Sequence, residues 1–275
     1  MAECNTCPSK NSCSVSPDTC TIQLNPHNNI KKVIGVMSGK GGVGKSTVSV
    51  LIAKELNKLG HKVGIMDSDI TGPSIPRLLG IKDAQVVSRD NIIHPAETDD
   101  GIKVISFNLL MEDENQPVIW RGPIVSSAVQ QFWTDVSWGD LDYLIIDMPP
   151  GTGDVALTVM DSIPINGLVV VSVPQDMISM IVAKAVNMAR KMNIDVIGVI
   201  QNMSYILCPN CGEKIRMYDA DNVDGFIEDL NLKLLGEMPM VKEISNLSFN
   251  GYENSSETID EIFKPIIENI LDNLK

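Results

Sequence analysis

The sequence predicts an α/β fold built on a doubly wound, mostly parallel sheet. From residue 31 onward, short apolar runs alternate with segments of helical period. Two of these runs, residues 143–146 and 168–171, are continuously apolar, as expected of parallel strands buried on both faces. A glycine-rich turn joins the first strand to the first helix, and such a turn is a common ligand site in this fold class.

The individual elements follow from residue type and period. Runs rich in Val and Ile predict strands at 32–38, 62–66, 102–107, 142–147, 167–173, 194–201 and 232–236. Apolar residues three and four apart predict helices at 45–59, 73–80, 122–134, 154–162, 176–192, 219–230 and 257–274. The last helix has one broad apolar face and an acidic opposite face, so we expect it to dock on the sheet rather than on anionic lipid.

Residues 39–47 read GKGGVGKST and fit the phosphate-binding template G-x-x-x-x-G-K-[ST] at each fixed position. Glycines let backbone N–H groups turn toward phosphate oxygens, and Lys45 is expected to reach the β- and γ-phosphates. The Ser46 hydroxyl is expected to bind Mg²⁺, so we expect ATP and Mg²⁺ as cofactors. The alternative is a turn without a ligand. The loop residues expected at the nucleotide are Gly39, Lys40, Gly41, Gly42, Val43, Gly44, Lys45, Ser46 and Thr47.

Two acidic motifs follow predicted strands, where a doubly wound sheet places its ligands. Asp147 closes an apolar run, as a Walker B carboxylate does when it holds a Mg²⁺-bound water. Asp67 and Asp69 follow an earlier strand in the motif DSDITGPS. A helix N-cap is the structural alternative, and it suits Asp154 better than Asp147.

Composition excludes several classes of function. The chain has 275 residues and a net charge of −13, which disfavours a surface that binds nucleic acid by neutralising phosphates. The start lacks a basic and apolar leader, and no run approaches the length of a membrane span. We therefore expect a cytoplasmic protein with no nucleic-acid or membrane partner. Its six cysteines are expected to be reduced thiols available for metal or redox chemistry.

The cysteines form two sets. Cys208 and Cys211 belong to a C-P-N-C-G turn, which supplies two of the four thiolates that a zinc ion or an iron–sulfur cluster needs. Spacing alone leaves both metals open. The second set has the spacing C-x2-C-x5-C-x6-C, which suits a Cys₄ cluster, a zinc site or a tail of reactive thiols. Its members are Cys4, Cys7, Cys13 and Cys20.

Four further motifs resemble those of the Mrp/ApbC family of iron–sulfur carrier ATPases. They are D-x-D-x-x-G-P-S at 67–74, W-R-G-P at 120–123, D-M-P-P-G-T-G-D at 147–154 and Q-N-M-S at 201–204. The resemblance runs from about residue 31 to 239. It implies ATP-dependent assembly of a [4Fe–4S] cluster and its transfer to apo iron–sulfur proteins. We thus expect a P-loop ATPase domain at 30–275 and a cysteine-rich extension at 1–29.

The same resemblance implies roles for individual residues. The loop is similar to that of the MinD/ParA-like ATPases, in which a lysine at the place of Lys40 reaches the partner's nucleotide across a homodimer. Lys40, Lys45 and Asp69 are then catalytic, with Asp69 polarising the attacking water. Asp67 lies near the metal. Asn202 reads adenine, although a strand-end turn is an alternative for this residue.

For the cysteines, the resemblance implies that the two-cysteine turn meets its twin across the dimer axis and holds a bridging [4Fe–4S] cluster. Eukaryotic cytosolic relatives carry a second cluster on C-x13-C-x2-C-x5-C. Here the core at Cys4, Cys7 and Cys13 matches, but Cys20 follows it and no cysteine precedes it. Two other functions stay open at this point. They are a MinD/ParA-type positioning ATPase and an ATPase with structural zinc.

Overall fold

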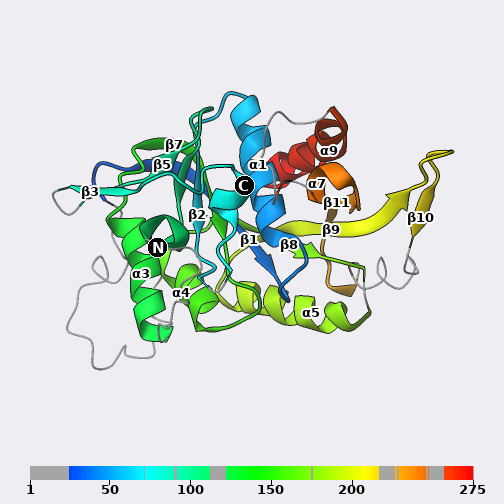
Figure 1. Cartoon of the computed structure of the whole chain (residues 1–275). Helices are drawn as coiled ribbons and strands as arrows, with labels where there is room; N and C mark the ends of the chain where they lie inside the picture. Colours follow the sequence, from blue (N-terminus) through cyan, green and yellow to red (C-terminus); the bar gives the residue numbers. More distant parts are fainter. Residues whose placement is uncertain are drawn as a thin grey trace.

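A computed structural model of the chain describes residues 25–70, 72–89, 92–111, 122–174, 176–216, 227, 229–245, 247 and 257–274. Its centre is a mixed sheet flanked by helices on both faces (Figure 1). The strands run in the order β10-β9-β8-β1-β7-β2-β6-β5, and β11 also pairs with β9. Within this described part, no helix is long and apolar enough to cross a membrane.

The strands that form the middle of the sheet are parallel and buried. Antiparallel pairing occurs only at the two ends of the described sheet, between β5 and β6 and between β9 and β10. The strand bounds are β1 Asn29–Ser38, β2 Val63–Asp67, β5 Ala96–Glu97, β6 Lys103–Ile105, β7 Asp140–Asp147, β8 Gly167–Ser172, β9 Val196–Leu207, β10 Lys214–Arg216 and β11 Leu234–Pro239. Because β1, β2 and β7 are parallel neighbours, their carboxyl ends meet at one edge of the sheet.

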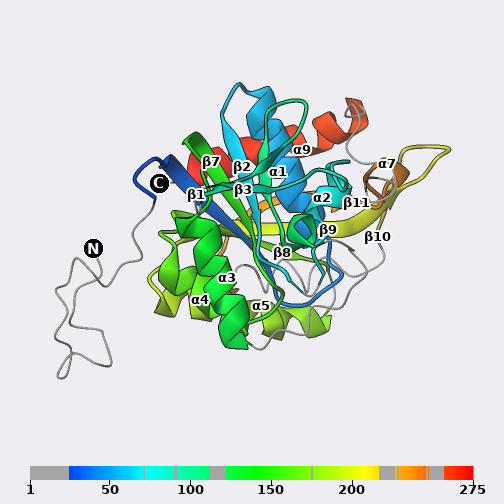
Figure 2. The same cartoon turned by 60° about the vertical axis from the view of Figure 1, so that its left-hand side comes forward.

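The helices cover the two faces of this sheet unequally. Helices α1 and α9 lie on one face, and α3, α4 and α5 lie on the other, as both views show (Figures 1 and 2). The helix bounds are α1 Lys45–Lys58, α2 Ile75–Leu78, α3 Gly122–Thr134, α4 Asp154–Ser162, α5 Asp176–Lys191, α7 Lys242–Ser245 and α9 Glu257–Asn273. The apolar face of α9, including Ile259, Phe263 and Ile266, is buried, which confirms that this helix docks on the sheet.

The predicted fold class is confirmed, and several element bounds are corrected. Strand β9 extends to Leu207, six residues beyond the predicted end at 201. The predicted strand at 102–107 is shorter, because a 3₁₀ turn begins at Phe107. Helix α2 has one turn instead of two. Most of the helix predicted at 219–230 lies outside the described residues, as does most of the extension at 1–29.

A small hairpin was not predicted. Strands β3 Val87–Arg89 and β4 Ile92–His94 pair with each other and not with the main sheet. Each of these strands has only three residues, and their side chains are mostly exposed. They therefore lack the long, buried apolar run that predicts the central strands.

Candidate nucleotide site and cysteine hairpin

The glycine-rich loop connects the end of β1 to the start of α1. Gly42 and Gly44 have φ angles of 80° and 82°, a conformation that glycine adopts without steric cost. A Cβ atom on Gly41 or Gly42 would meet nothing within 4 Å, so the loop backbone is open on the side of the site. The N-terminus of α1 follows at Lys45 and provides backbone N–H groups for an anion.

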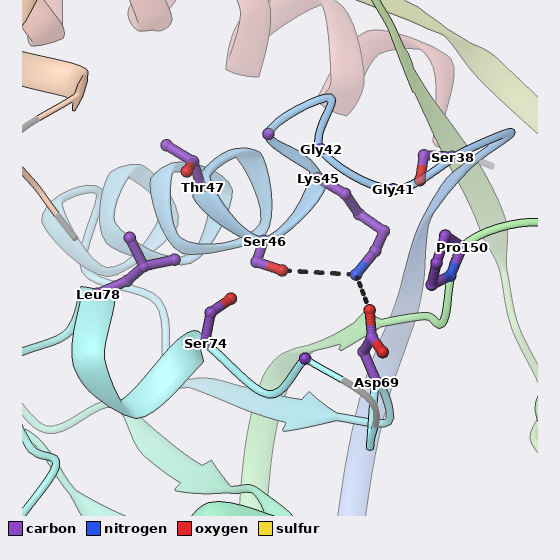
Figure 3. Close-up of a pocket in the computed structure, with 12 residues that line it drawn as sticks. Ser38, Gly41, Gly42, Lys45, Ser46, Thr47, Asp69, Ser74, Leu78 and Pro150 are labelled. Atoms are coloured by element: carbon purple, nitrogen blue, oxygen red, sulfur yellow. Dashed lines mark hydrogen bonds and ion pairs between the residues drawn. The ribbon is translucent and has the colours of Figure 1, made fainter. Parts of the chain in front are cut away.

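A cavity of about 420 Å³ lies against this loop (Figure 3). Twelve residues line it: Ser38, Gly41, Gly42, Gly44, Lys45, Ser46, Thr47, Asp69, Gly72, Ser74, Leu78 and Pro150. They come from the loop and α1, the segment after β2, and the segment after β7. The cavity therefore lies at the carboxyl edge of the parallel strands, as predicted from the positions of the motifs.

Lys45 is the centre of the charge network in this cavity. Its Nζ lies 2.8 Å from Asp147 Oδ2 and 3.7 Å from Asp69 Oδ2. Burial by itself lowers the pKa of Lys45, but the Asp147 carboxylate outweighs it, with smaller contributions from Asp69 and Asp67, and raises the pKa above 10.5. Lys45 is therefore a cation at neutral pH, with only 6% of its surface exposed.

Asp147 is fully buried and held by two hydroxyl groups in addition to Lys45. Ser46 Oγ donates to its Oδ2 at 2.6 Å, and Ser49 Oγ donates to its Oδ1 at 2.7 Å. Ser49 was not predicted as a site residue. Its position one turn after Lys45, on the buried side of α1, is the signal that could have found it.

Asp67 lies beside Asp147 because the two residues are in register on β2 and β7. Ser106 Oγ donates to Asp67 Oδ2 at 2.9 Å, a second hydroxyl contact that sequence reasoning missed. Burial and then the nearby Asp147 charge raise the pKa of Asp67 to about 8. This shift favours the neutral form of the Asp67 carboxyl.

Asn202 contacts the loop from a position that differs from the predicted one. It lies inside β9, not after a strand, and only 2% of its surface is exposed. Its Nδ2 donates to the backbone oxygen of Val43 at 2.8 Å. Lys40, by contrast, is partly exposed and does not line the cavity.

The second candidate site is the turn between β9 and β10, which carries Cys208 and Cys211. The turn is closed by two backbone hydrogen bonds, from Cys208 N to Glu213 O and from Gly212 N to Cys208 O, both 2.9 Å long. Gly212 has φ 72°, which favours glycine at this place. Both cysteines are free thiols, and Cys211 is exposed.

The geometry of the turn favours the deprotonated, thiolate form of Cys208. Backbone N–H groups of Asn210 and Cys211 lower the pKa of the Cys208 thiol. Among the residues that the structure describes, no group of three or more His, Cys, Asp or Glu side chains is arranged to hold a metal ion. The turn therefore offers a pair of ligands. The other predicted set, Cys4, Cys7, Cys13 and Cys20, lies outside the described residues.

The comparison with protein families matches residues 29–275 to the group described as ParA: NUBPL iron-transfer P-loop NTPase. The chain belongs to this iron-transfer P-loop NTPase family. The match covers the loop, both acidic motifs and the cysteine hairpin, so the whole candidate site lies within the family domain.

Relatives cover nearly the full chain. An iron-sulfur cluster carrier protein of Clostridium perfringens is 47% identical over 98% of this chain and all of its own length. A protein of the same name from Methanocaldococcus jannaschii is 42% identical over 98% of this chain and 96% of its own. The mouse iron-sulfur cluster transfer protein NUBPL is 42% identical over 81% of this chain and 70% of its own.

Solved structures agree with the family assignment. A nucleotide-binding protein of Archaeoglobus fulgidus, solved with ADP, is 40% identical and superposes with a TM-score of 0.71 over 82% of this chain and 90% of its own. The cell division ATPase MinD of Pyrococcus furiosus is 19% identical, with a TM-score of 0.60 over 88% of this chain and 98% of its own. At that identity the MinD structure shows the shared fold alone.

Proposed function

We propose that the chain is an ATP-dependent iron–sulfur cluster carrier that binds a [4Fe–4S] cluster and transfers it to apo iron–sulfur proteins. The observation that carries this proposal is the pair of accessible cysteines on the turn that follows β9, in the same domain as a complete phosphate-binding loop. The names of two relatives support this proposal. The Clostridium protein is called an iron-sulfur cluster carrier protein, and the mouse protein is called an iron-sulfur cluster transfer protein.

The nucleotide site has the parts that a slow ATP hydrolase needs. We propose that Lys45 and the loop N–H groups bind the β- and γ-phosphates, and that Asn202 lies on the adenine side. Asp69 lines the cavity, and we propose that it orients the attacking water. The carboxylate and hydroxyl oxygens near Lys45 also suit Mg²⁺, because this ion takes oxygen ligands and keeps several of its water molecules.

We propose that Ser46, Asp67 and Asp147 face this metal. Ser46 and Asp147 already share a hydrogen bond at the loop, and Asp67 is the register partner of Asp147. A bound Mg²⁺ neutralises charge that develops on the phosphates. A divalent cation facing Asp67 would stabilise its charged carboxylate form.

The cluster site is incomplete within one chain. The turn of one chain supplies two cysteine ligands, Cys208 and Cys211, whereas a [4Fe–4S] cluster takes four. A two-fold homodimer supplies the same pair twice and completes the set. We propose that Lys40 reaches the partner's nucleotide in this dimer, which links nucleotide state to the distance between the two cysteine pairs. The four N-terminal cysteines are proposed as a separate, second cluster site.

The test compares the two cysteine sets in the full chain. One variant carries Ser at Cys4, Cys7, Cys13 and Cys20; a second adds Cys208→Ser. After anaerobic reconstitution, the first should hold about one four-iron cluster per dimer, as the ligand count requires. The second should hold none and lose transfer to an apoprotein, while its ATP hydrolysis persists because the cavity is unchanged.

Two results contradict this function. A colourless first variant with stoichiometric zinc supports a structural zinc ATPase instead. One cluster per monomer excludes the bridging site, because it requires two further ligands from each chain. Co-sedimentation with anionic vesicles or DNA separates the remaining alternative, a positioning ATPase of the MinD type. We expect no binding in that assay, since the net charge is −13.

A further inference from the structure

Strand β9 connects the two candidate sites directly. It passes the phosphate-binding loop at Asn202 and ends at Leu207, one residue before Cys208. Figures 1 and 2 show β9 continuing past the helices into the β9–β10 hairpin, which projects from the body of the molecule. A movement at Asn202 therefore has a short covalent path to the cysteines.

The contact between Asn202 and the loop is tight and specific. The Asn202 amide donates to Val43 O, and a Cβ atom on Gly44 would lie only 2.2 Å from its Nδ2. Only a glycine at position 44 admits the amide at this distance. The amide is buried with the loop backbone, so a change in the shape of the loop changes the partner of Asn202.

The strand is irregular at the same place. Met203 has φ 53°, an uncommon conformation for a residue other than glycine, and its N–H donates to Asn202 Oδ1 instead of to a neighbouring strand. Glu237 of β11 pairs with Gln201, and Pro239 pairs with Tyr205, so β9 carries two extra residues between these pairs. Residues 202–204 thus form a β-bulge, which bends a strand and interrupts its pairing.

This bulge separates two hydrogen-bonded parts of β9. Before it, β9 pairs with β8 as far as the pair of Ser172 with Gln201. After it, β9 pairs with β10 from Tyr205 to Leu207. The base of the hairpin is fixed to β11, because Ser204 Oγ and the Arg216 guanidinium both donate to Glu237. The bulge therefore lies between the part of β9 that pairs with β8 and the part that forms the hairpin.

We infer that Asn202 is a positioning residue that couples occupancy of the phosphate-binding loop to the conformation of the cysteine hairpin, through the bulge at 202–204. The inference rests on the proposed nucleotide site and adds the route to the cysteines. When nucleotide fixes the loop, Val43 O holds Asn202 in one place, and the bulge and hairpin fluctuate less. By linkage, a ligand on the hairpin then changes nucleotide affinity by the same factor.

Hydrogen exchange of the full chain, prepared without iron or zinc, tests this coupling with and without saturating MgADP. In the wild type, MgADP should slow amide exchange in residues 39–47 and also in residues 203–216. The expected slowing in the hairpin is about fivefold, the low end of ordinary coupling between sites. In Asn202→Ala, MgADP is raised until residues 39–47 reach the wild-type protection, and under that condition the hairpin should no longer respond.

Asn269→Ala is the matched control. Asn269 Nδ2 donates to Leu235 O at 2.9 Å, the same kind of bond between an asparagine and a backbone carbonyl, without contact to the loop. This variant should keep the wild-type hairpin response. The inference is overturned if the hairpin does not respond in the wild type while residues 39–47 do, or if Asn202→Ala responds like the wild type. Absence of protection at 39–47 in the wild type instead contradicts the nucleotide site itself.

Discussion

Replacing Asp69 by Asn should separate nucleotide binding from hydrolysis. The substitution keeps the side-chain shape and removes one negative charge that lies 3.7 Å from Lys45 Nζ. At an effective dielectric constant of about 20, that attraction is roughly 4.5 kcal/mol. The loss is offset because Asp69 also repels the Asp147 carboxylate, and Lys45 keeps its closer contact to Asp147 at 2.8 Å. We therefore expect the free energy of unfolding to fall by less than the roughly 3–5 kcal/mol that breaking a buried ion pair costs.

Turnover should respond very differently. If Asp69 orients the attacking water, kcat should fall by about 10²–10⁴, while ATP affinity stays equal or rises because one carboxylate no longer faces the γ-phosphate. Single-turnover hydrolysis and ATP titration measure the two quantities separately. Asp161→Asn, an exposed change on α4 away from the cavity, should leave both unchanged. Normal kcat in Asp69→Asn, or a parallel loss of affinity and kcat, would refute this role.

Three further predictions follow from ion pairs and from the loop. Lys45→Met should abolish nucleotide binding in titration. It should also lower the free energy of unfolding by about 3 kcal/mol, because it leaves Asp147 buried without its cation. Adding Asp147→Asn to this variant should restore stability, measured by denaturant unfolding, but not nucleotide binding. Lys40→Ala should bind ATP yet remain monomeric in sedimentation with ATP; a normal ATP-dependent dimer would contradict its role across the interface. The Arg216 hydrogen bond lowers the pKa of Glu237, so its contribution to stability is present above pH 4.5 and is lost as the pH falls through the lower, folded-state pKa. Thermal unfolding from pH 6 to 3 should therefore show that Glu237→Gln loses less stability on acidification than the wild type does. The difference should be less than about 1 kcal/mol, because the ion pair is partly exposed. An equal loss of stability in the two proteins would contradict this prediction.

The sequence predicts the loop and the strand-end carboxylates well because their chemistry is local. A run of nine residues fixes the phosphate-binding template, and a carboxylate that directly follows a parallel strand has one available edge of the sheet. The structure accordingly brings the carboxylates of Asp69 and Asp147 together around the Lys45 ammonium.

The course of β9 could not be predicted in this way. Asn202, Met203 and Ser204 interrupt the apolar run, so the period indicates that the strand ends at 201. The strand continues because a bulge absorbs the interruption and β10 pairs with the segment after it. Hydroxyl partners such as Ser49 and Ser106 were also missed. A serine does not contribute to the hydrophobic pattern that predicts helices and strands. Its role depends on which carboxylate the fold places beside it.

The charge distribution of the free site explains how a loop that binds polyphosphate coexists with three buried or nearly buried carboxylates. Burial and the Asp147 charge raise the pKa of Asp67, and Lys45 pairs with Asp147, so the site does not present the full repulsion of its acidic residues to a nucleotide. When the proposed nucleotide binds, we expect Lys45 to exchange a carboxylate for phosphate oxygens. Asp147 would then keep the hydroxyl donors Ser46 and Ser49 but lose its cation, which is costly for a buried charge. A divalent cation at the proposed Mg²⁺ site would restore the positive charge that Asp147 gives up.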